Sequence, residues 1–463
     1  MFGRTRTTPT RLEPAPSAQS RRRLHLPRHR ATTANVCALY PAAIQTPLPP
    51  VGALLGIDLT AGDGPLCWDP FEAYSEGLVS NPNMFIMGEP GVAKSSLIKC
   101  WAYWQHCLYG RSRFLSFTDP KGEYRALAER LAMNVVRLAP GGTVRINPLE
   151  GVAKLSGIDL ERERIVQSTM LASLAATQLG RRLSQLERKV LRTVVTLTTG
   201  RRDITTPATL PDVIRLLESP TEELCADTKR NHREVVRDLE ELRFGIDELC
   251  SGTLRGMFDG PSTVNVDWDA PGLVVDLSGV VDDEQALAVV MVAAIGWSRQ
   301  QRHRLHGRQR INVNDESYYM YKQIETVEFA QSRRKLGRQL GEANIDICHR
   351  PSDLAAQADD GSKIAKLAQG LLSDSSMKVI FRQASGELAS ASEMFGLTET
   401  ETNCVSNLTR ARALWKIGDR SLLARHFRPR QLLDVTDTDR LMRRDSALSD
   451  TELQTDPLET AAS

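Results

Sequence analysis

The residues with the clearest chemical signature form one short run that follows an apolar strand predicted at 84–87. The run reads Gly88, Glu89, Pro90, Gly91, Val92, Ala93, Lys94 and Ser95, and Ser96 continues it into a predicted helix. In such a loop, successive backbone N–H groups at the positive end of a helix hold phosphate oxygens. Lys94 would reach the β- and γ-phosphates, and the Ser95 hydroxyl would bind Mg²⁺. The run predicts a nucleotide-binding loop.

One position departs from the usual pattern GxxxxGK[ST], because Ala93 replaces the second glycine. A Cβ atom there crowds the phosphates, and it costs energy if φ must be positive. Two interpretations stay open at this point. The loop works with a mild defect, or it is degenerate and no longer binds nucleotide.

An acidic pair, Asp315 and Glu316, comes at the end of a strand predicted at 311–315. A phosphoryl-transfer site needs two such carboxylates: Asp315 to hold the Mg²⁺ shell and Glu316 to polarise the attacking water. The strand is more polar than expected, since it contains Asn312 and Asn314. By itself, an adjacent Asp and Glu is weak evidence for a catalytic site. The phosphate loop upstream is what strengthens the functional interpretation.

The elements that must position these residues follow an alternating pattern. Short apolar strands are predicted at 84–87, 113–118 and 135–138, with a helix at 95–109 between the first two. Alternating strands and helices predict a parallel sheet. Helices are then predicted at 165–179, 186–198, 210–217 and 230–249, and strands return at 273–277, 311–315, 345–349, 378–382 and 413–417. This order predicts an α/β core interrupted by an α-helical insertion.

The chain divides into five predicted segments on these grounds. Residues 1–50 are a basic arm rich in proline and arginine, and 431–463 are an acidic tail; both are expected to be largely disordered. Residues 51–155 and 263–430 are the two parts of the core, and 156–262 are the helical insertion.

Composition excludes several classes of protein. A net charge of +2 over 463 residues argues against a nucleic-acid coat, and 5% aromatic residues argue against an all-β sandwich. The eight cysteines contain no CxxC pair, so neither a zinc module nor a disulfide scaffold is expected. No run reaches the roughly 18 apolar residues that span a bilayer, so we expect no transmembrane segment.

Several strings in a fixed order resemble one known family. They are NPNMFIMGEPGVAKSSLIK, FTDPKGEY, RINPL, LVVDLSGV, GEANIDICHRPSDL, SDSSMKVIFRQ and RALWKIGDRSLLARH, and the likeness covers about residues 24–440. The chain resembles conjugative type IV secretion ATPases of the FtsK/HerA superfamily, in particular the TraC/VirB type of actinobacterial conjugative elements. The loop itself also resembles those of MoxR-type AAA+ ATPases, which carry Ala at the position of Ala93.

The resemblance implies a RecA-like P-loop ATPase core with a mainly parallel sheet, ATP and Mg²⁺ as ligands, and a homo-hexamer. It implies a motor that powers pilus assembly or substrate transfer beside a membrane complex, in the cytoplasm or at the inner face of the cell membrane. Two alternatives stay open: an FtsK/TraG-like DNA translocase or coupling protein, and an inactive scaffold that keeps the fold.

The resemblance also implies roles for residues at the ends of later strands. Asp119 and Glu123 lie near the phosphates or simply form a turn, and His349 is a γ-phosphate sensor or a core histidine. Arg382 and Gln383 come at the end of the next predicted strand, where one of them senses the γ-phosphate or serves a neighbouring subunit as an arginine finger. A surface arginine is the alternative, and weaker finger candidates are Arg410 and Arg412.

Two basic runs remain. One extends over 299–310 and the other contains Arg333, Arg334, Lys335 and Arg338. They are either solvated helical faces, which we favour, or the lining of a pore that makes non-specific DNA contacts.

Overall fold

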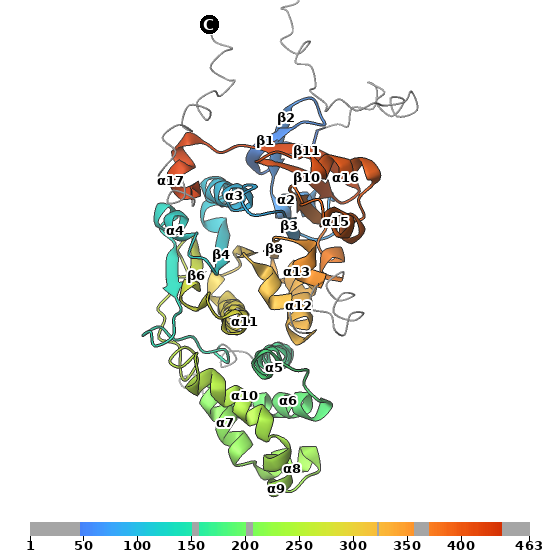
Figure 1. The fold of residues 1–463 in the computed structure, drawn as a ribbon. Coiled ribbons are helices and arrows are strands. Elements are labelled where there is room, and N and C mark those ends of the chain that lie inside the picture. The colour runs from blue at the N-terminus through green and yellow to red at the C-terminus, as the bar shows by residue number, and fades with distance from the viewer. Residues whose placement is uncertain (1–46, 151–156, 201–206, 322–323, 356–369, 438–463) are drawn as a thin grey trace, which may run out of the picture. The chain divides into compact units, whose positions relative to one another are not determined.

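The computed structural model describes residues 47–150, 157–200, 207–321, 324–355 and 370–437. Among these residues lies an 11-stranded sheet with the strand order β2-β1-β11-β10-β9-β3-β8-β7-β4-β6-β5 (Figure 1). The predicted basic arm falls almost entirely outside the described residues, as does most of the acidic tail. The part of the tail that is described includes a short helix, α17 (Leu433–Thr436), which packs against α3 (Lys94–Tyr109).

The sheet is parallel from β9 to β5 and antiparallel beyond β9. The parallel strands, in spatial order, are β9 (Met377–Ile380), β3 (Met84–Met87), β8 (Glu342–Cys348), β7 (Gln309–Asn314), β4 (Arg113–Asp119), β6 (Gly272–Asp276) and β5 (Asn134–Arg137). The antiparallel strands are β10 (Arg412–Ile417), β11 (Arg420–His426), β1 (Ala53–Asp58) and β2 (Gly64–Trp68).

Helices cover both faces of the parallel strands. One apolar core joins α3 and α4 (Arg125–Leu131) to the face that carries Ile86 and Phe117. The other joins α11 (Glu284–Gln300), α12 (Ile324–Leu340) and α5 (Gly157–Leu179) to the face that carries Phe85 and Phe114. Strands buried on both faces read as continuous apolar runs, which is why β3 is MFIM.

A block of helices connects β5 to β6, in the stretch that the sequence predicts as an insertion. After α5 come α6 (Gln185–Gly200), α7 (Leu210–Glu218), α8 (Glu222–Thr228), α9 (His232–Asp238) and α10 (Glu240–Ser251). Its apolar side chains share one core with α11, so this block packs onto the sheet layer through α5. The helix predicted at 230–249 is wrong as a single element, because α9 ends at Asp238 and Leu239 has non-helical ψ.

The remaining helices are short. They are α2 (Pro70–Ser75) before β3, α13 (Pro351–Ala355) after β8, and α15 (Leu388–Phe395) and α16 (Glu399–Ser406) between β9 and β10. In the described part of the chain, no helix has both the length and the apolar character needed to cross a bilayer.

The register of the parallel strands brings their carboxyl ends together. Met87 pairs with both Cys348 of β8 and Ile380 of β9, and Asn314 of β7 pairs with Thr118 of β4. The residues that follow these strands therefore gather at one edge of the sheet. Open α/β sheets bind their ligands at this edge.

Candidate active site

The predicted phosphate loop connects β3 to α3. Gly91 and Ala93 both have positive φ, of 81° and 82° respectively, and Ala93 is the residue that precedes the helix. An L-residue in this left-handed region is strained by about 1–2 kcal/mol. The strain expected from the missing glycine is therefore present at Ala93. Gly88 has a different reason to be glycine, since a Cβ atom there would lie 2.4 Å from the Cβ of Phe381.

Lys94 is folded back over the loop and buried. Its ammonium donates hydrogen bonds to the carbonyl oxygens of Gly88 and Glu89, the latter at 2.9 Å, and lies 2.9 Å from Nδ1 of His349. Burial lowers the pKa of Lys94 from its ordinary value to about 8, although the charges of Asp315 and Glu316 oppose the shift. A lysine so placed is a cation at neutral pH that faces the loop and the acidic pair.

The acidic pair follows the last residue of β7. Asp315 is buried and accepts a hydrogen bond of 3.0 Å from the hydroxyl of Tyr124. Glu316 has a φ of 49°, and one of its carboxylate oxygens, Oε1, lies 2.7 Å from Nε2 of His349 and pairs with the ammonium of Lys121. The other oxygen, Oε2, is buried without a hydrogen-bond partner.

The two carboxyl groups titrate in opposite directions. Burial, together with the charge of Glu316, raises the pKa of Asp315 to about 6. Burial also acts to raise the pKa of Glu316, but the hydrogen bond from His349 and the charge and hydrogen bond of Lys121 outweigh it, and this pKa lies below its ordinary value. Glu316 is the carboxylate that stays ionised, as a group that must accept a proton requires.

Asp119 closes a turn after β4. Its two oxygens accept backbone N–H bonds from Glu123 at 3.1 Å and from Tyr124 at 2.8 Å, and burial raises its pKa to about 6. This turn holds Lys121 against Glu316. Sequence reasoning missed Lys121, although the string DPKGEY that contains it was noted. Glu123 lies 3.9 Å from the ammonium of the buried Lys99.

The segment after β9 lies directly against the loop. The N–H of Glu89 donates to the carbonyl of Arg382 at 3.2 Å, and the half-exposed guanidinium of Arg382 bonds the carboxylate of Glu89 at 3.2 Å. Gln383 is buried, with its Nε2 donating to the Phe381 carbonyl and its Oε1 without a partner.

Arg410 and Arg412, the weaker candidates for an arginine finger, flank a residue that also contacts the phosphate loop. Ala411, between Arg410 and Arg412, donates its N–H to the carbonyl of Val92 at 3.2 Å. Arg410 is exposed and Arg412 is half-buried. The structure thus brings all three arginine candidates to the vicinity of the loop without singling one out.

The two basic runs are only partly solvated, which corrects both interpretations given above. Arg299 and Arg310 are buried, and so are Arg333 and Arg334 on α12. Arg334 pairs with Asp346 of β8, and Arg310 bonds Ser116 and Ser298. These four residues line neither a solvated face nor a pore. The exposed members are Arg302, Arg304, Lys335 and Arg338.

The residues at this edge fit a nucleotide with Mg²⁺. The unpartnered Oε2 of Glu316 lies beside a loop whose helix start and lysine suit a phosphate. Among the described residues no group of three or more His, Cys, Asp or Glu side chains could hold a metal by itself. Mg²⁺ in such sites instead takes one hydroxyl and one carboxylate together with phosphate oxygens and water, and Ser95 and Asp315 are the residues available.

A parallel sheet with a phosphate loop after β3 and an acidic pair after β7 defines a RecA-like P-loop ATPase fold, as the sequence predicts. No family model matches the chain. It is 24% identical over 370 residues to protein TraC of Escherichia coli (strain K12), a match that covers 79% of this chain and 39% of TraC. The chain thus spans about two fifths of the length of that relative.

Solved structures share the fold. VirB4 of Thermoanaerobacter pseudethanolicus superposes with a TM-score of 0.65 at 18% identity, over 84% of this chain and 99% of VirB4. The plasmid coupling protein TrwB, in complex with ADP and Mg²⁺, superposes with a TM-score of 0.52 at 15% identity, over 75% of this chain and 86% of TrwB. The similarity to TraC in sequence and to VirB4 in fold confirms the resemblance to conjugative ATPases of the VirB4/TraC type.

Proposed function

We propose that this chain hydrolyses ATP with Mg²⁺ and is the motor of a conjugative type IV secretion apparatus, powering pilus assembly or substrate transfer. The observation that carries the proposal is the chain of contacts from Lys94 through His349 to Glu316. It joins the cation of the phosphate loop to the ionised carboxylate of the acidic pair. This arrangement favours a working loop over a degenerate one.

The residues divide the work between binding and proton transfer. Lys94 and the backbone N–H groups of the loop would bind the phosphates, and Ser95 and Asp315 would hold Mg²⁺. When bound there, Mg²⁺ would supply positive charge beside the transferring phosphate. Glu316 accepts a proton from the attacking water, and His349 and Lys121 position its carboxylate.

The decisive experiment measures phosphate release at saturating ATP. Lys94→Ala removes a cation from the transferring phosphate, and such contacts are typically worth several kcal/mol, so turnover should fall by about 10²-fold or more. Lys335→Ala, which removes an exposed lysine of α12, serves as the control and should keep wild-type turnover. Equal rates for wild type and Lys94→Ala would reject ATP hydrolysis at this loop and favour the inactive scaffold.

A coupling protein is the second candidate, because the chain also shares its fold with TrwB. The two candidates differ in how they respond to DNA. A DNA translocase should hydrolyse ATP faster when DNA is added, and the stimulation should fall as salt rises. We expect no such stimulation, in part because Arg299, Arg310, Arg333 and Arg334 are buried rather than available to a phosphate backbone.

We further propose that the working form is a homo-hexameric ring beside a membrane complex. A RecA-like site leaves its γ-phosphate side open, and a neighbouring subunit can close it with an arginine. Arg382, half-exposed next to the loop, is our first candidate for that arginine. Sedimentation with and without an ATP analogue tests the ring.

A further inference from the structure

The turn that follows β4 contacts both carboxylates of the acidic pair. Near its start, the ammonium of Lys121 pairs with Glu316. At its end, the hydroxyl of Tyr124 donates a hydrogen bond of 3.0 Å to Oδ2 of Asp315. Tyr124 is fully buried, with an exposed fraction of 0%, so its hydroxyl has no access to a bound nucleotide. Its contact with the site therefore passes through Asp315.

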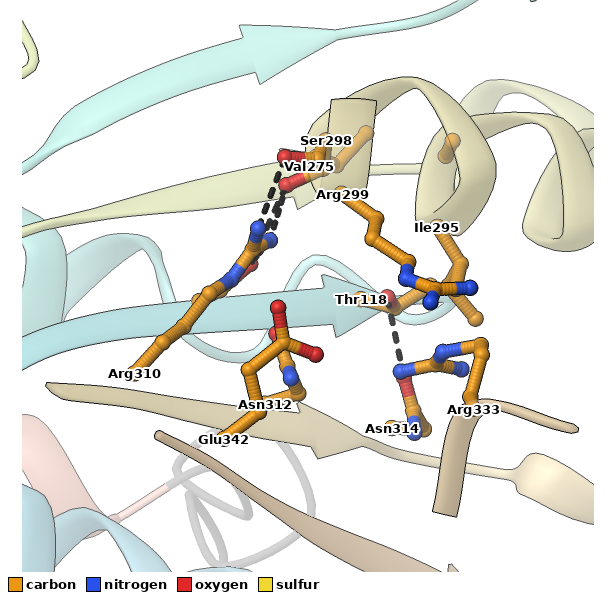
Figure 2. A pocket seen from close by; sticks show the side chains of 12 residues that line it. Thr118, Val275, Ile295, Ser298, Arg299, Arg310, Asn312, Asn314, Arg333 and Glu342 are labelled. Atoms are coloured by element: carbon orange, nitrogen blue, oxygen red, sulfur yellow. Dashed lines mark hydrogen bonds between the residues drawn. The ribbon is translucent and has the colours of Figure 1, made fainter. Parts of the chain in front are cut away.

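The backbone at Asp315 is held independently of Tyr124. Its N–H donates to the carbonyl of Thr118 at 3.2 Å. On the α11 face of the sheet, the Thr118 hydroxyl donates to the amide oxygen of Asn314 at 3.4 Å, as Figure 2 shows. The amide nitrogen of Asn314 donates to Asp346 of β8 at 2.6 Å. These bonds join the ends of β4, β7 and β8, so loss of the Tyr124 hydroxyl should leave this strand end in place.

The carboxylate of Asp315 has one hydrogen-bond donor for each of its oxygens. Oδ1 accepts the N–H of Glu316 at 2.9 Å, and Oδ2 accepts the hydroxyl of Tyr124. An ionised carboxylate offers about four acceptor positions, so both oxygens keep room for a cation or for water bound to one. Among the described residues, Tyr124 is the side chain that bonds this carboxylate and so fixes its rotation.

Three contacts hold Tyr124 itself in place. Its backbone N–H donates to Asp119 at 2.8 Å, and its ring packs on Phe117 with 4.7 Å between the ring centroids. The ammonium of Lys99 lies 5.4 Å from the centroid of the Tyr124 ring. Lys99 is buried on α3, the helix that begins at Lys94. A donor supported in this way can hold a functional side chain in one orientation.

The hydrogen bonds of a carboxylate influence how well it binds a metal. Carboxylates that ligate a metal are themselves hydrogen-bonded, and loss of such a partner typically lowers metal affinity or activity by about 10–100-fold. Mg²⁺ demands near-ideal octahedral geometry, so it is sensitive to a carboxylate that rotates. The bond from Tyr124 to Asp315 is therefore placed where it would matter for Mg²⁺.

We propose that Tyr124 is the positioning residue of the Mg²⁺ site, and that its hydroxyl holds the Asp315 carboxylate in the orientation that binds the ion. Because Asp315 is assigned to Mg²⁺ under the proposed function, this role of Tyr124 rests on that function. The turn after β4 then has two tasks: Lys121 positions the base Glu316, and Tyr124 positions the metal-binding Asp315. Tyr124 should therefore affect the Mg²⁺ dependence of the site more than its affinity for nucleotide alone.

The first test measures the Kd of a fluorescent, non-hydrolysable ATP analogue in EDTA and in Mg²⁺. The ratio of the two values reports how strongly the site binds the ion. Tyr124→Phe keeps the packed ring and removes the hydroxyl. We expect its Kd in EDTA to stay within about twofold of wild type and the ratio to fall by about tenfold. Tyr74→Phe, which removes an exposed tyrosine hydroxyl of α2, should keep the wild-type ratio.

Three results of this test would overturn the proposal. An unchanged ratio in Tyr124→Phe would mean that the hydroxyl does not act on the ion. An equal loss of affinity in EDTA and in Mg²⁺ would mean that its role is structural. A wild-type chain whose affinity does not respond to Mg²⁺ would reject the positioning role together with the Mg²⁺ site.

The second test measures phosphate release as a function of Mg²⁺ concentration. In Tyr124→Phe the Mg²⁺ concentration at half-maximal rate should rise by about tenfold, whereas kcat at saturating Mg²⁺ should recover to within about twofold of wild type. A kcat that stays low at every Mg²⁺ concentration would overturn the proposal. A wild-type chain that releases no phosphate but binds the analogue more tightly in Mg²⁺ would reject ATP hydrolysis, and a lower ratio in Tyr124→Phe would still support the positioning role.

Discussion

The ammonium nitrogen of Lys94 lies 2.9 Å from Nδ1 of His349, on two segments that are 255 residues apart in the sequence. Because a protonated lysine only donates, Nδ1 must accept, and the proton of a neutral imidazole then resides on Nε2. That Nε2 is the atom that lies 2.7 Å from Glu316. The imidazole of His349 therefore contacts both the loop lysine and the carboxylate that we assign as the base.

Nucleotide affinity should depend on pH through Lys94. Its pKa of about 8 lies below the ordinary lysine value, so the cation that binds phosphate is lost as pH rises through 8. The Kd of a non-hydrolysable ATP analogue should rise above pH 8 by up to about tenfold per unit. Titrations between pH 7 and 9.5 measure this. Lys94→Met should bind weakly with no such slope, and a flat wild-type profile would contradict the assignment.

Glu316→Gln should retain ATP and stop turnover. The amide has nearly the same shape as the carboxylate but cannot take a proton from water, so kcat should fall by about 10²–10⁴-fold. The measurement is single-turnover hydrolysis together with nucleotide retention on a desalting column. Glu129→Gln, an exposed change on α4, should behave as wild type. Loss of binding in Glu316→Gln would instead mark Glu316 as structural.

Lys121→Met should shift the acid limb of the kcat profile to higher pH. Lys121 helps to hold the pKa of Glu316 below its ordinary value, so without it that pKa rises and the carboxylate becomes protonated at higher pH. A purely structural role for Lys121 would lower kcat equally at every pH. Lys121→Arg keeps the charge and should restore most of the wild-type profile.

Ala93→Gly should stabilise the protein. Glycine removes about 1–2 kcal/mol of left-handed strain and costs about 0.4–1 kcal/mol of unfolded-state entropy, which leaves a gain of about 1 kcal/mol. Urea unfolding measures this change in the free energy of unfolding. Ala226→Gly, on an exposed helical position of α8, should lose about 1 kcal/mol. Nucleotide affinity should stay equal or improve in Ala93→Gly, and a marked fall would mean that the alanine is tuned to the site.

Mixing two inactive proteins tests the shared site. Arg382→Ala and Lys94→Ala should each be inactive, and in mixed rings some interfaces pair an intact Lys94 with a neighbour's intact Arg382. Partial ATPase activity should then return. Arg382 also bonds Glu89 of its own loop. Size-exclusion chromatography should first show that the two proteins form mixed rings. If ATPase activity does not return in such rings, Arg382 acts within its own subunit or not at all.

The parallel half of the sheet was predictable because local patterns determine it. The strand predicted at 84–87 is β3 as observed, and the strand predicted at 311–315 ends one residue from β7. Residues that follow apolar strands gather at one sheet edge in any parallel α/β fold, so the loop, the acidic pair and His349 could be found from the sequence.

The antiparallel half and the interior charges were not predictable from local pattern. The direction of β1 and β11 depends on a pairing between distant segments. Lys121 acquires a partner only through the turn that Asp119 closes. Arginines in a basic run are usually solvated, and nothing in the run over 299–310 separates the buried Arg310 from the exposed Arg304.

The pairing of β1 with β11 constrains folding during synthesis. Gly56 is paired with His426, about 370 residues later, so one edge of the β1–β2 hairpin has no partner until nearly all of the core has been translated. At 5–20 residues per second, ribosomes need roughly 20–70 s to make that stretch. An open strand edge is a template for pairing with other chains. The nascent protein is therefore exposed to aggregation through this edge of its first hairpin, and a chaperone that covers the hairpin would protect it until the last strand emerges.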